Sequence, residues 1–98
     1  MKTQAGKTIA ALILNEKDDV AVLVRPVAAG EFITVGGARG HFTLHAKAAT
    51  PLGHKLALHA LAAGSNIRKY GEVIGRLRAD VAAGEHVHVH NLVSLRAH

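Results

Sequence analysis

Apolar residues in this chain fall into short runs that are separated by Gly, Pro, Asn and acidic residues. Runs of about four to eight apolar or alternating residues between such turn residues are typical of β-strands. The pattern predicts strands at residues 9–14, 20–24, 32–35, 42–44, 55–58, 67–70 and 85–91. Residues 56–63 also fit a short helix, but Gly64 limits it to a helical turn. A mainly β fold is therefore predicted.

One short phrase, an apolar residue followed by Ala-Ala-Gly, occurs at residues 27–30, 61–64 and 81–84. The two alanines suit a single tight helical turn, and the glycine can adopt a positive φ. An apolar residue three positions beyond each glycine then opens a strand. We expect the fold to reuse this turn, while the unequal spacing of the copies excludes a regular solenoid.

Length and composition indicate one small globular domain. The chain has 98 residues, of which 49% are hydrophobic, and only Phe32, Phe42 and Tyr70 are aromatic. Its core must therefore consist mainly of Val, Leu, Ile and Ala. We expect residues 1–98 to form this domain, with residues 1–7 as a flexible N-terminal segment. A domain with a core of this size often gains stability from a partner subunit, and that partner could be a second copy of the chain.

Cysteine is absent from the sequence, which excludes disulfides and thiolate metal sites and fits a reducing cytoplasm. The apolar run at residues 9–14 is too short for a signal peptide or a membrane span, so no membrane role is expected. The net charge of +5 is spread along the chain, and few aromatic residues are present to stack bases. An anionic substrate or an acidic partner subunit therefore fits better than nucleic acid.

The histidines near the C-terminus are the clearest candidates for chemistry. Residues 85–91 alternate in the manner of a strand, which places His86, His88 and His90 on one face and Val87 and Val89 on the other. On a strand the first and last imidazoles would lie about 13 Å apart, so one ion could bind an adjacent pair only and would need ligands from elsewhere. The alternative is a row of surface or interface histidines that hydrogen-bond their neighbours.

Two further segments combine glycine with reactive side chains. His54 and Lys55 follow Gly53 after a predicted turn at residues 50–53, where His54 could carry protons and Lys55 could bind a carboxylate or act as a base. At residues 69–75, Glu72 could accept a hydrogen bond from a substrate hydroxyl group. For both segments, a solvated turn is the alternative.

Three phrases occur in order along the chain: Gly53-His54-Lys55-Leu56-Ala57-Leu58, Lys69-Tyr70-Gly71-Glu72-Val73-Ile74-Gly75 and Gly84-Glu85-His86-Val87-His88-Val89-His90-Asn91. Together they resemble the SAF domain of the altronate and galactarate dehydratases, and the similarity extends over most of the chain. In that family the module has a β-clip fold and either precedes a large catalytic region or forms a separate small subunit. The resemblance implies a compact, SAF-like β-clip domain with short helical turns, in the form of the small subunit.

The resemblance also implies an activity. Members of the family remove water from a sugar acid with the help of Fe²⁺ or Mn²⁺, and a related two-subunit branch eliminates sulfite from sulfolactate. The expected partner is a large catalytic subunit that holds or shares the metal, and this chain alone would be inactive. The matching motif positions imply catalytic roles for His54, Lys55, His86 and His88, substrate binding by Lys55, Lys69 and Asn91, and metal binding by His86, His88 and His90.

A second hypothesis follows from the same resemblance, because SAF modules also occur as non-catalytic domains that bind carbohydrate or cap a substrate. In that case the histidines would hydrogen-bond a polyhydroxy acid, and the large subunit would hold all the metal ligands. The sequence assigns no functional role to His41, His45, His59 or His98.

Overall fold

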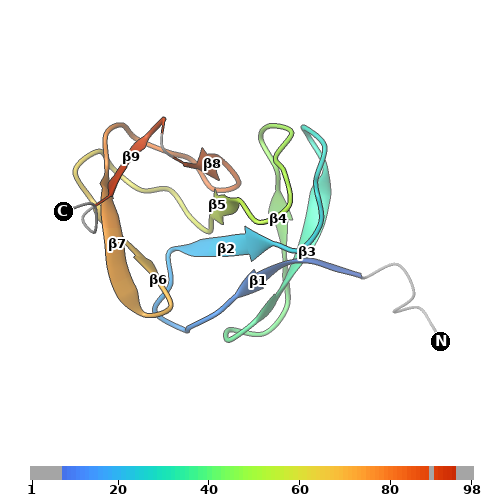
Figure 1. Ribbon diagram of the computed structural model, residues 1–98. Helices are drawn as coiled ribbons and strands as arrows, with labels where there is room; N and C mark the ends of the chain where they lie inside the picture. The colour runs from blue at the N-terminus through green and yellow to red at the C-terminus, as the bar shows by residue number, and fades with distance from the viewer. Residues whose placement is uncertain (1–7, 89, 95–98) are drawn as a thin grey trace.

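The computed structural model describes residues 8–88 and 90–94, and all regular secondary structure in this part of the chain is β (Figure 1). The mainly β prediction is therefore confirmed. The expected N-terminal flexible segment, residues 1–7, lies outside the described residues. The strands are β1 (Ile9–Ile13), β2 (Val20–Leu23), β3 (Phe32–Gly37), β4 (Phe42–His45), β5 (Lys55–Ala57), β6 (Asn66–Lys69), β7 (Glu72–Leu77), β8 (His86–Val87) and β9 (Leu92–Ser94).

The strands form two sheets. The larger has the order β4-β3-β1-β2-β5-β8, and the smaller has the order β6-β7-β9. Strands β1 and β3 pair in parallel, whereas the other strand pairs are antiparallel. Figure 1 shows β1 and β2 crossing the centre of the molecule, β3 and β4 rising on one side, and the smaller sheet on the other. Within the described residues, no helix is long and apolar enough to cross a membrane.

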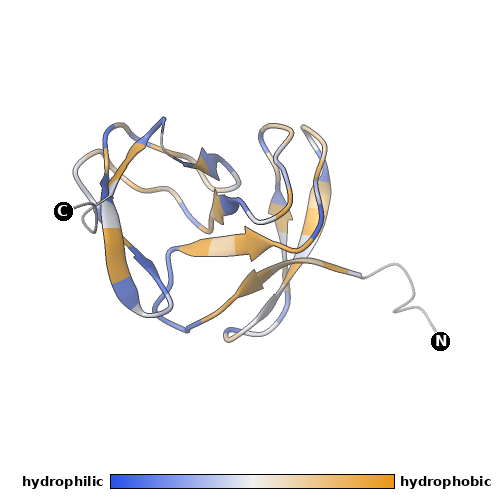
Figure 2. Ribbon diagram, in the orientation of Figure 1, coloured by the Kyte–Doolittle hydropathy of each residue, from blue (hydrophilic) through white to orange (hydrophobic). Residues whose placement is uncertain are grey.

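Strands β2 and β5 are buried on both faces because they lie between two apolar clusters. Ala21 and Leu56 pack into a cluster with β1, β3 and β4, whereas Val20 and Ala57 pack into a second cluster with β6, β7 and β8. Alternate residues of a strand point to opposite faces, so each strand contributes to both clusters. This explains the continuous apolar run of β2, which is coloured mostly orange in Figure 2.

The repeated Ala-Ala-Gly phrase forms the same turn three times, but the expected helical turn was wrong. In each copy a hydrogen bond closes a four-residue β-turn, for example from Glu85 N to Ala82 O at 3.1 Å. The third turn residue has a positive φ of 81° at Gly30, 87° at Gly64 and 85° at Gly84, which indicates a type II turn. Each of these glycines also donates its N–H to a distant carbonyl group, so the turn joins segments that are far apart in sequence.

Strand β7 was not predicted, because Gly71 just before it and Gly75 within it suggested a turn. The structure shows why a glycine is needed within this strand. A Cβ atom on Gly75 would lie 2.6 Å from the carbonyl oxygen of Val93, which belongs to the neighbouring strand β9. The glycine permits the close approach of β9 and does not end the strand.

The two sheets are joined through Asp18 and Asp19, which lie between β1 and β2. The buried carboxylate of Asp18 accepts hydrogen bonds from the backbone N–H groups of Tyr70 (3.0 Å) and Gly71 (2.8 Å) at the tip of the β6–β7 hairpin. The carboxylate of Asp19 accepts one from Arg68 N at 2.8 Å. These contacts hold the smaller sheet against the β1–β2 connection.

Replacing Asp18 should therefore destabilise the fold. Asp18→Ala removes the acceptor for two N–H groups, and we expect a loss of about 2–4 kcal/mol in the free energy of unfolding, measured by urea denaturation. Asp80→Ala is the matched control, because the exposed Asp80 accepts a single backbone hydrogen bond, from Ala63 at 2.8 Å. Equal losses in the two variants would show that Asp18 has no special structural role.

Candidate active site and metal centre

His54 is positioned by a turn that is attached to the end of β2. The backbone N–H of His54 donates to Pro51 O at 3.2 Å, and Gly53 adopts a φ of 84°. Leu23 then fixes the turn from the side, because its N–H donates to His54 O and its carbonyl oxygen accepts from Gly53 N, both at 2.9 Å. The predicted turn at residues 50–53 is thus present one residue later, and it directs His54 toward β8.

His86 and His88 are positioned by a second turn. Strand β8 ends at Val87, and the chain then reverses through a hydrogen bond of 3.0 Å from Asn91 N to His88 O. The Asn91 side chain is buried and holds both histidines: Oδ1 accepts from His88 N, and Nδ2 donates to His86 O, each at 2.9 Å. The amide of Asn91 therefore orients the histidine segment.

The predicted strand at residues 85–91 was therefore wrong beyond Val87, and the histidine row is bent. The ring centroids of His86 and His90 lie 5.3 Å apart, far closer than a strand would allow. Val87 is fully buried, as predicted, whereas Val89 lies outside the described residues. The turn thus gathers imidazoles that a continuous strand would separate.

Three histidines from distant parts of the chain converge at this place. Nδ1 of His54 and Nε2 of His86 are 2.9 Å apart and share a hydrogen bond. The His54 ring stacks on His88 with a centroid distance of 4.2 Å, and the rings of His86 and His88 stack at 5.2 Å. One ring nitrogen from each histidine lies within 4.8 Å of the others. All three side chains are partly exposed, so a ligand can reach them.

The surroundings of these rings disfavour positive charge. Burial, the neighbouring imidazoles of His54, His88 and His90, and Lys55 lower the pKa of His86 to about 4. Burial and the same kind of neighbours also lower the pKa of His88. Burial, followed by repulsion from Lys69, lowers the pKa of Lys55. His86 is therefore uncharged at neutral pH, and one of its ring nitrogens carries a lone pair that can bind a metal ion.

The donor set fits a divalent transition metal. Ligand bonds of about 2.0–2.2 Å place neighbouring donor atoms about 3–3.5 Å apart, which agrees with the 2.9 Å separation of the His54 and His86 nitrogens. Small side-chain rotations would bring a ring nitrogen of His88 to the same spacing from the other two. Among the described residues, the group with this spacing consists of His54, His86 and His88. It contains His54, which was not among the predicted metal ligands, and leaves out His90, which was.

The remaining predicted site residues lie beside this group. Lys55 follows His54 directly and shares a face of β5 with Ala57. Ala57 packs in one cluster with Ile67, and Lys69 lies on the Ile67 face of β6. Lys55 therefore lies next to the histidines, whereas Lys69 is close enough to Lys55 to repel its charge. Of the histidines without an assigned role, His45 stacks on Phe32 with a centroid distance of 4.3 Å, and His59 lies 3.4 Å from Asp19.

The sequence of this chain can now be compared with known proteins. The profile described as "Altronate/galactarate dehydratase SAF domain" matches residues 9–95. The chain belongs to this family. Relatives include the (2R)-sulfolactate sulfo-lyase subunit alpha of Chromohalobacter salexigens, which is 39% identical over 88 residues, or 86% of this chain and 94% of the relative. The protein of the same name from Paracoccus pantotrophus is 51% identical over 55 residues, or 56% of this chain and 82% of the relative.

A longer relative is the altronate dehydratase of Escherichia coli K12. It is 42% identical over 78 residues, which are 80% of this chain but only 15% of that enzyme. The SAF domain thus occurs both in a short subunit and as a small part of a long enzyme. The predicted family is confirmed, and the three phrases that carried the resemblance lie at the turns and strands that build the histidine cluster and its surroundings.

The depressed pKa of His86 predicts a specific loss of stability in acid. The unfolded chain takes up a proton at His86 near pH 6.5, whereas the folded chain does so only near pH 4. The unfolded state therefore binds more protons between these values, and the free energy of unfolding should fall as the pH drops from about 6.5 to about 4.

His86→Gln should weaken this dependence, because glutamine keeps a polar group near the Nε2 position but does not titrate. Urea unfolding at pH 7 and pH 4.5 in the presence of a chelator measures the effect. His41→Gln is the control, since His41 is exposed and should leave the difference between the two pH values unchanged. An unaltered difference in His86→Gln would contradict the prediction.

Asn91 should matter for the arrangement of the rings as well as for stability. Asn91→Ala removes both side-chain hydrogen bonds of the histidine turn, and we expect a loss of about 1–3 kcal/mol in the free energy of unfolding. The imidazole NMR signals of His86 and His88 should also move toward those of free histidine. Asn66→Ala on the exposed face of β6 is the control, and it should leave these signals in place. Unshifted signals in Asn91→Ala would rule out the orienting role.

Proposed function

We propose that this chain is the small subunit of a metal-dependent lyase that acts on a sugar acid or a similar hydroxy acid, in complex with a large catalytic subunit. Family membership supports the reaction class, because the relatives are named as a sulfo-lyase subunit and a dehydratase. The near full-length match to a protein named subunit alpha supports the role of a separate subunit. The absence of cysteine fits a cytoplasmic complex.

The observation that carries the proposal is the convergence of His54, His86 and His88 within 4.8 Å. Two turns and Asn91 bring these imidazoles together from β8, from the turn that follows it and from the loop before β5, and their surroundings keep His86 uncharged. In this proposal the three rings hold Fe²⁺ or Mn²⁺, and the partner completes the coordination. Imidazole ligands favour Fe²⁺ over Mn²⁺, which prefers oxygen ligands.

The reaction is a β-elimination. A base removes the proton next to the substrate carboxylate, hydroxide or sulfite leaves the neighbouring carbon, and the resulting enol becomes a keto acid after one proton transfer. A metal ion held by His54, His86 and His88 would supply a Lewis acid for the negative charge that develops on the substrate. Histidines that bind the metal cannot take the proton through the same nitrogen, so the base comes from elsewhere in the complex.

Lys55 is the proton carrier that this chain contributes. It lies next to the histidine group, and burial and Lys69 lower its pKa. A lysine with a lowered pKa gives up its proton more readily, which suits a general acid at the departing hydroxyl group. In this proposal Lys69 binds the substrate carboxylate. Asn91 orients His86 and His88, and any contact with substrate would be additional to this role.

A binding role without chemistry is the second candidate. The direct hydrogen bond between His54 and His86 shows that the rings can satisfy one another without a metal ion. The same partly exposed rings could hydrogen-bond the hydroxyl groups of a sugar acid and position it for a large subunit that holds all the metal ligands.

An assay of the reconstituted complex distinguishes these candidates. The chain is mixed with the large-subunit homologue from the same organism and tested with Fe²⁺ or Mn²⁺ on sugar acids and sulfolactate, with each subunit alone as a control. Turnover by the mixture alone is expected. His86→Ala and His88→Ala should lower kcat at least about 100-fold if the rings hold the metal, whereas a raised KM at constant kcat indicates the binding role. His41→Ala should leave both constants unchanged. Equal turnover by the large subunit alone would refute the proposal.

A further inference from the structure

The tip of the β6–β7 hairpin carries an unusual residue. Lys69 pairs with Glu72, so Tyr70 and Gly71 form a two-residue loop. Their φ angles are 56° and 77°, and Tyr70 is the non-glycine residue with a positive φ in the described part of the chain. Two positive φ angles define a type I′ turn, whose first position favours Asn, Asp or Gly. A tyrosine here costs stability that an asparagine would not.

The surrounding structure compensates for this cost and holds the turn firmly. Asp18 accepts hydrogen bonds from both turn N–H groups, and the Arg68 side chain donates to Gly71 O at 3.1 Å. Gly71 packs so closely on Asn15 that a Cβ atom would lie 2.9 Å from Asn15 Nδ2. The turn is therefore anchored to the β1–β2 connection on one side and to its own strand on the other.

The Tyr70 ring takes no part in this anchoring. The residue is 65% exposed. The Lys69 ammonium group lies over its ring, at 5.1 Å from the ring centroid. An exposed aromatic ring on a rigid turn loses little conformational entropy on binding, and tyrosine is enriched among the residues that dominate interface energies. The strained backbone and the exposed ring together indicate a role in binding.

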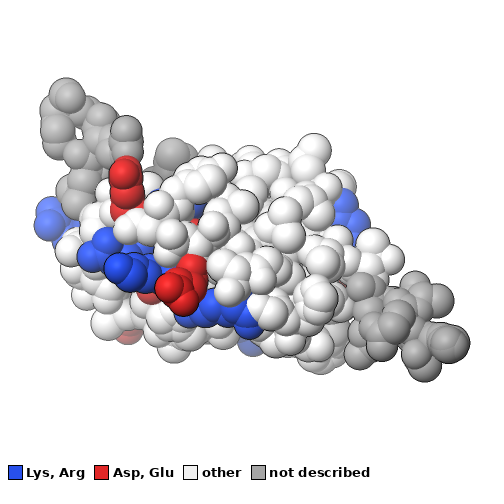
Figure 3. Space-filling model, turned by 90° about the horizontal axis from the view of Figure 1, so that it is seen from below, with Lys and Arg blue, Asp and Glu red and all other residues white. Residues whose placement is uncertain are grey.

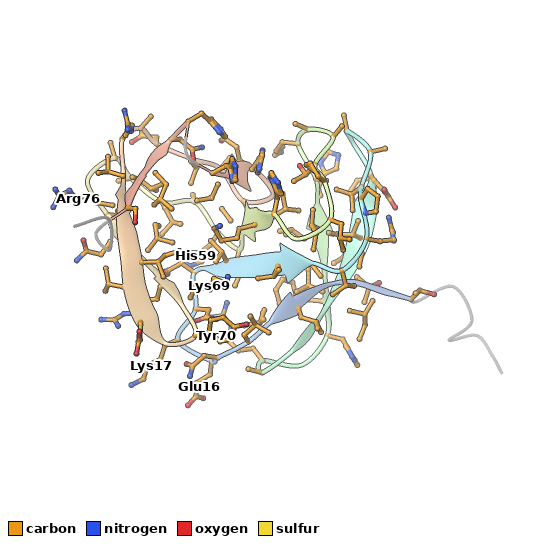
Figure 4. All side chains as sticks on the ribbon, viewed as in Figure 1. Glu16, Lys17, His59, Lys69, Tyr70 and Arg76 are labelled. Atoms are coloured by element: carbon orange, nitrogen blue, oxygen red, sulfur yellow. The ribbon has the colours of Figure 1, made fainter. Side chains whose placement is uncertain are left out.

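Basic side chains surround the ring. Lys69 and Arg68 flank it, and Figure 4 shows Lys17 and Glu16 at the same end of the molecule. Arg39 reaches this end as well, since its guanidinium group donates to Glu16 O at 3.4 Å. Figure 3 shows the Lys and Arg side chains gathered on this side of the molecule, with fewer acidic ones among them. A second copy of the chain would bring like charges together, so an acidic protein surface is the complementary partner.

We propose that Tyr70 and the basic side chains around it form the docking surface for an acidic patch of the large catalytic subunit, with the Tyr70 ring inserted into an apolar pocket. This inference rests on the proposed function, which supplies the partner. Within this surface, the Lys69 ammonium group lies over the Tyr70 ring, so one charge and one aromatic ring can be engaged together.

Tyr70→Asn tests the docking surface, because it should separate stability from binding. Asparagine suits the turn, so the midpoint of thermal unfolding of the isolated chain should stay the same or rise. The Kd for the large subunit, measured by calorimetry, should increase at least about tenfold. Phe32→Thr removes another exposed aromatic ring, 71% exposed on β3, and should change the Kd less than about threefold.

Each outcome has a distinct meaning. If the wild-type chain forms no complex with the large subunit, the proposed function fails and the docking surface fails with it. If the wild-type complex forms but Tyr70→Asn binds equally well, or Phe32→Thr weakens binding as much, only the docking surface is overturned. A third result would also overturn the docking surface: Tyr70→Asn still binds the large subunit, but it loses a salt-sensitive binding to an unrelated oligonucleotide that the wild-type chain has. That result would indicate a nucleic-acid surface.

Discussion

The buried carboxylate of Asp18 is the contact on which the arrangement of the two sheets depends. It accepts both N–H groups at the tip of the β6–β7 hairpin and so links residues that are more than 50 positions apart in sequence. A buried charge is tolerated only when such hydrogen bonds compensate for the lost solvation. Asp18 therefore fixes the smaller sheet and stabilises the strained turn that presents Tyr70.

The histidine cluster depends on two turns and on the hydrogen bonds that hold them. One turn places His54 beside β8, and another, held by the Asn91 amide, reverses the chain directly after Val87. The repeated Ala-Ala-Gly turn lies just before β8, where Gly84 donates its N–H to Ala57 O at 2.8 Å. This bond fixes β8 against β5 and brings the two histidine-bearing segments to the same edge of the sheet. The position of the cluster is thus a consequence of backbone hydrogen bonds and of the two hydrogen bonds of the Asn91 side chain.

The double burial of β2 and β5 gives the site a rigid support. Both strands lie between the two apolar clusters, and His54 and Lys55 stand at the start of β5. A shift in register would exchange side chains of different size between the two packed clusters, and each exchange would leave a cavity or create a clash. The imidazoles and Lys55 are therefore held at fixed positions although they are partly exposed.

The sequence by itself determined the class of fold, most of the strands, the reused turn and the family. These features are local: an alternating run, a glycine after two alanines and a short motif can each be recognised within a few residues. Strand β7 was missed because the need for Gly75 comes from the backbone of β9, which lies far along the chain. A long-range close approach leaves no local signal in the sequence.

The tertiary structure alone decided how the candidate ligands assemble. The alternation of residues 86–90 predicted a straight row, but the Asn91 side chain bends the segment and brings His86 within 5.3 Å of His90. His54 joins His86 and His88 because β5 pairs with β8, and this pairing depends on the whole sheet. The sequence contained the right residue types. Their distances were set by strand pairing and by turns whose hydrogen-bond partners lie elsewhere in the fold.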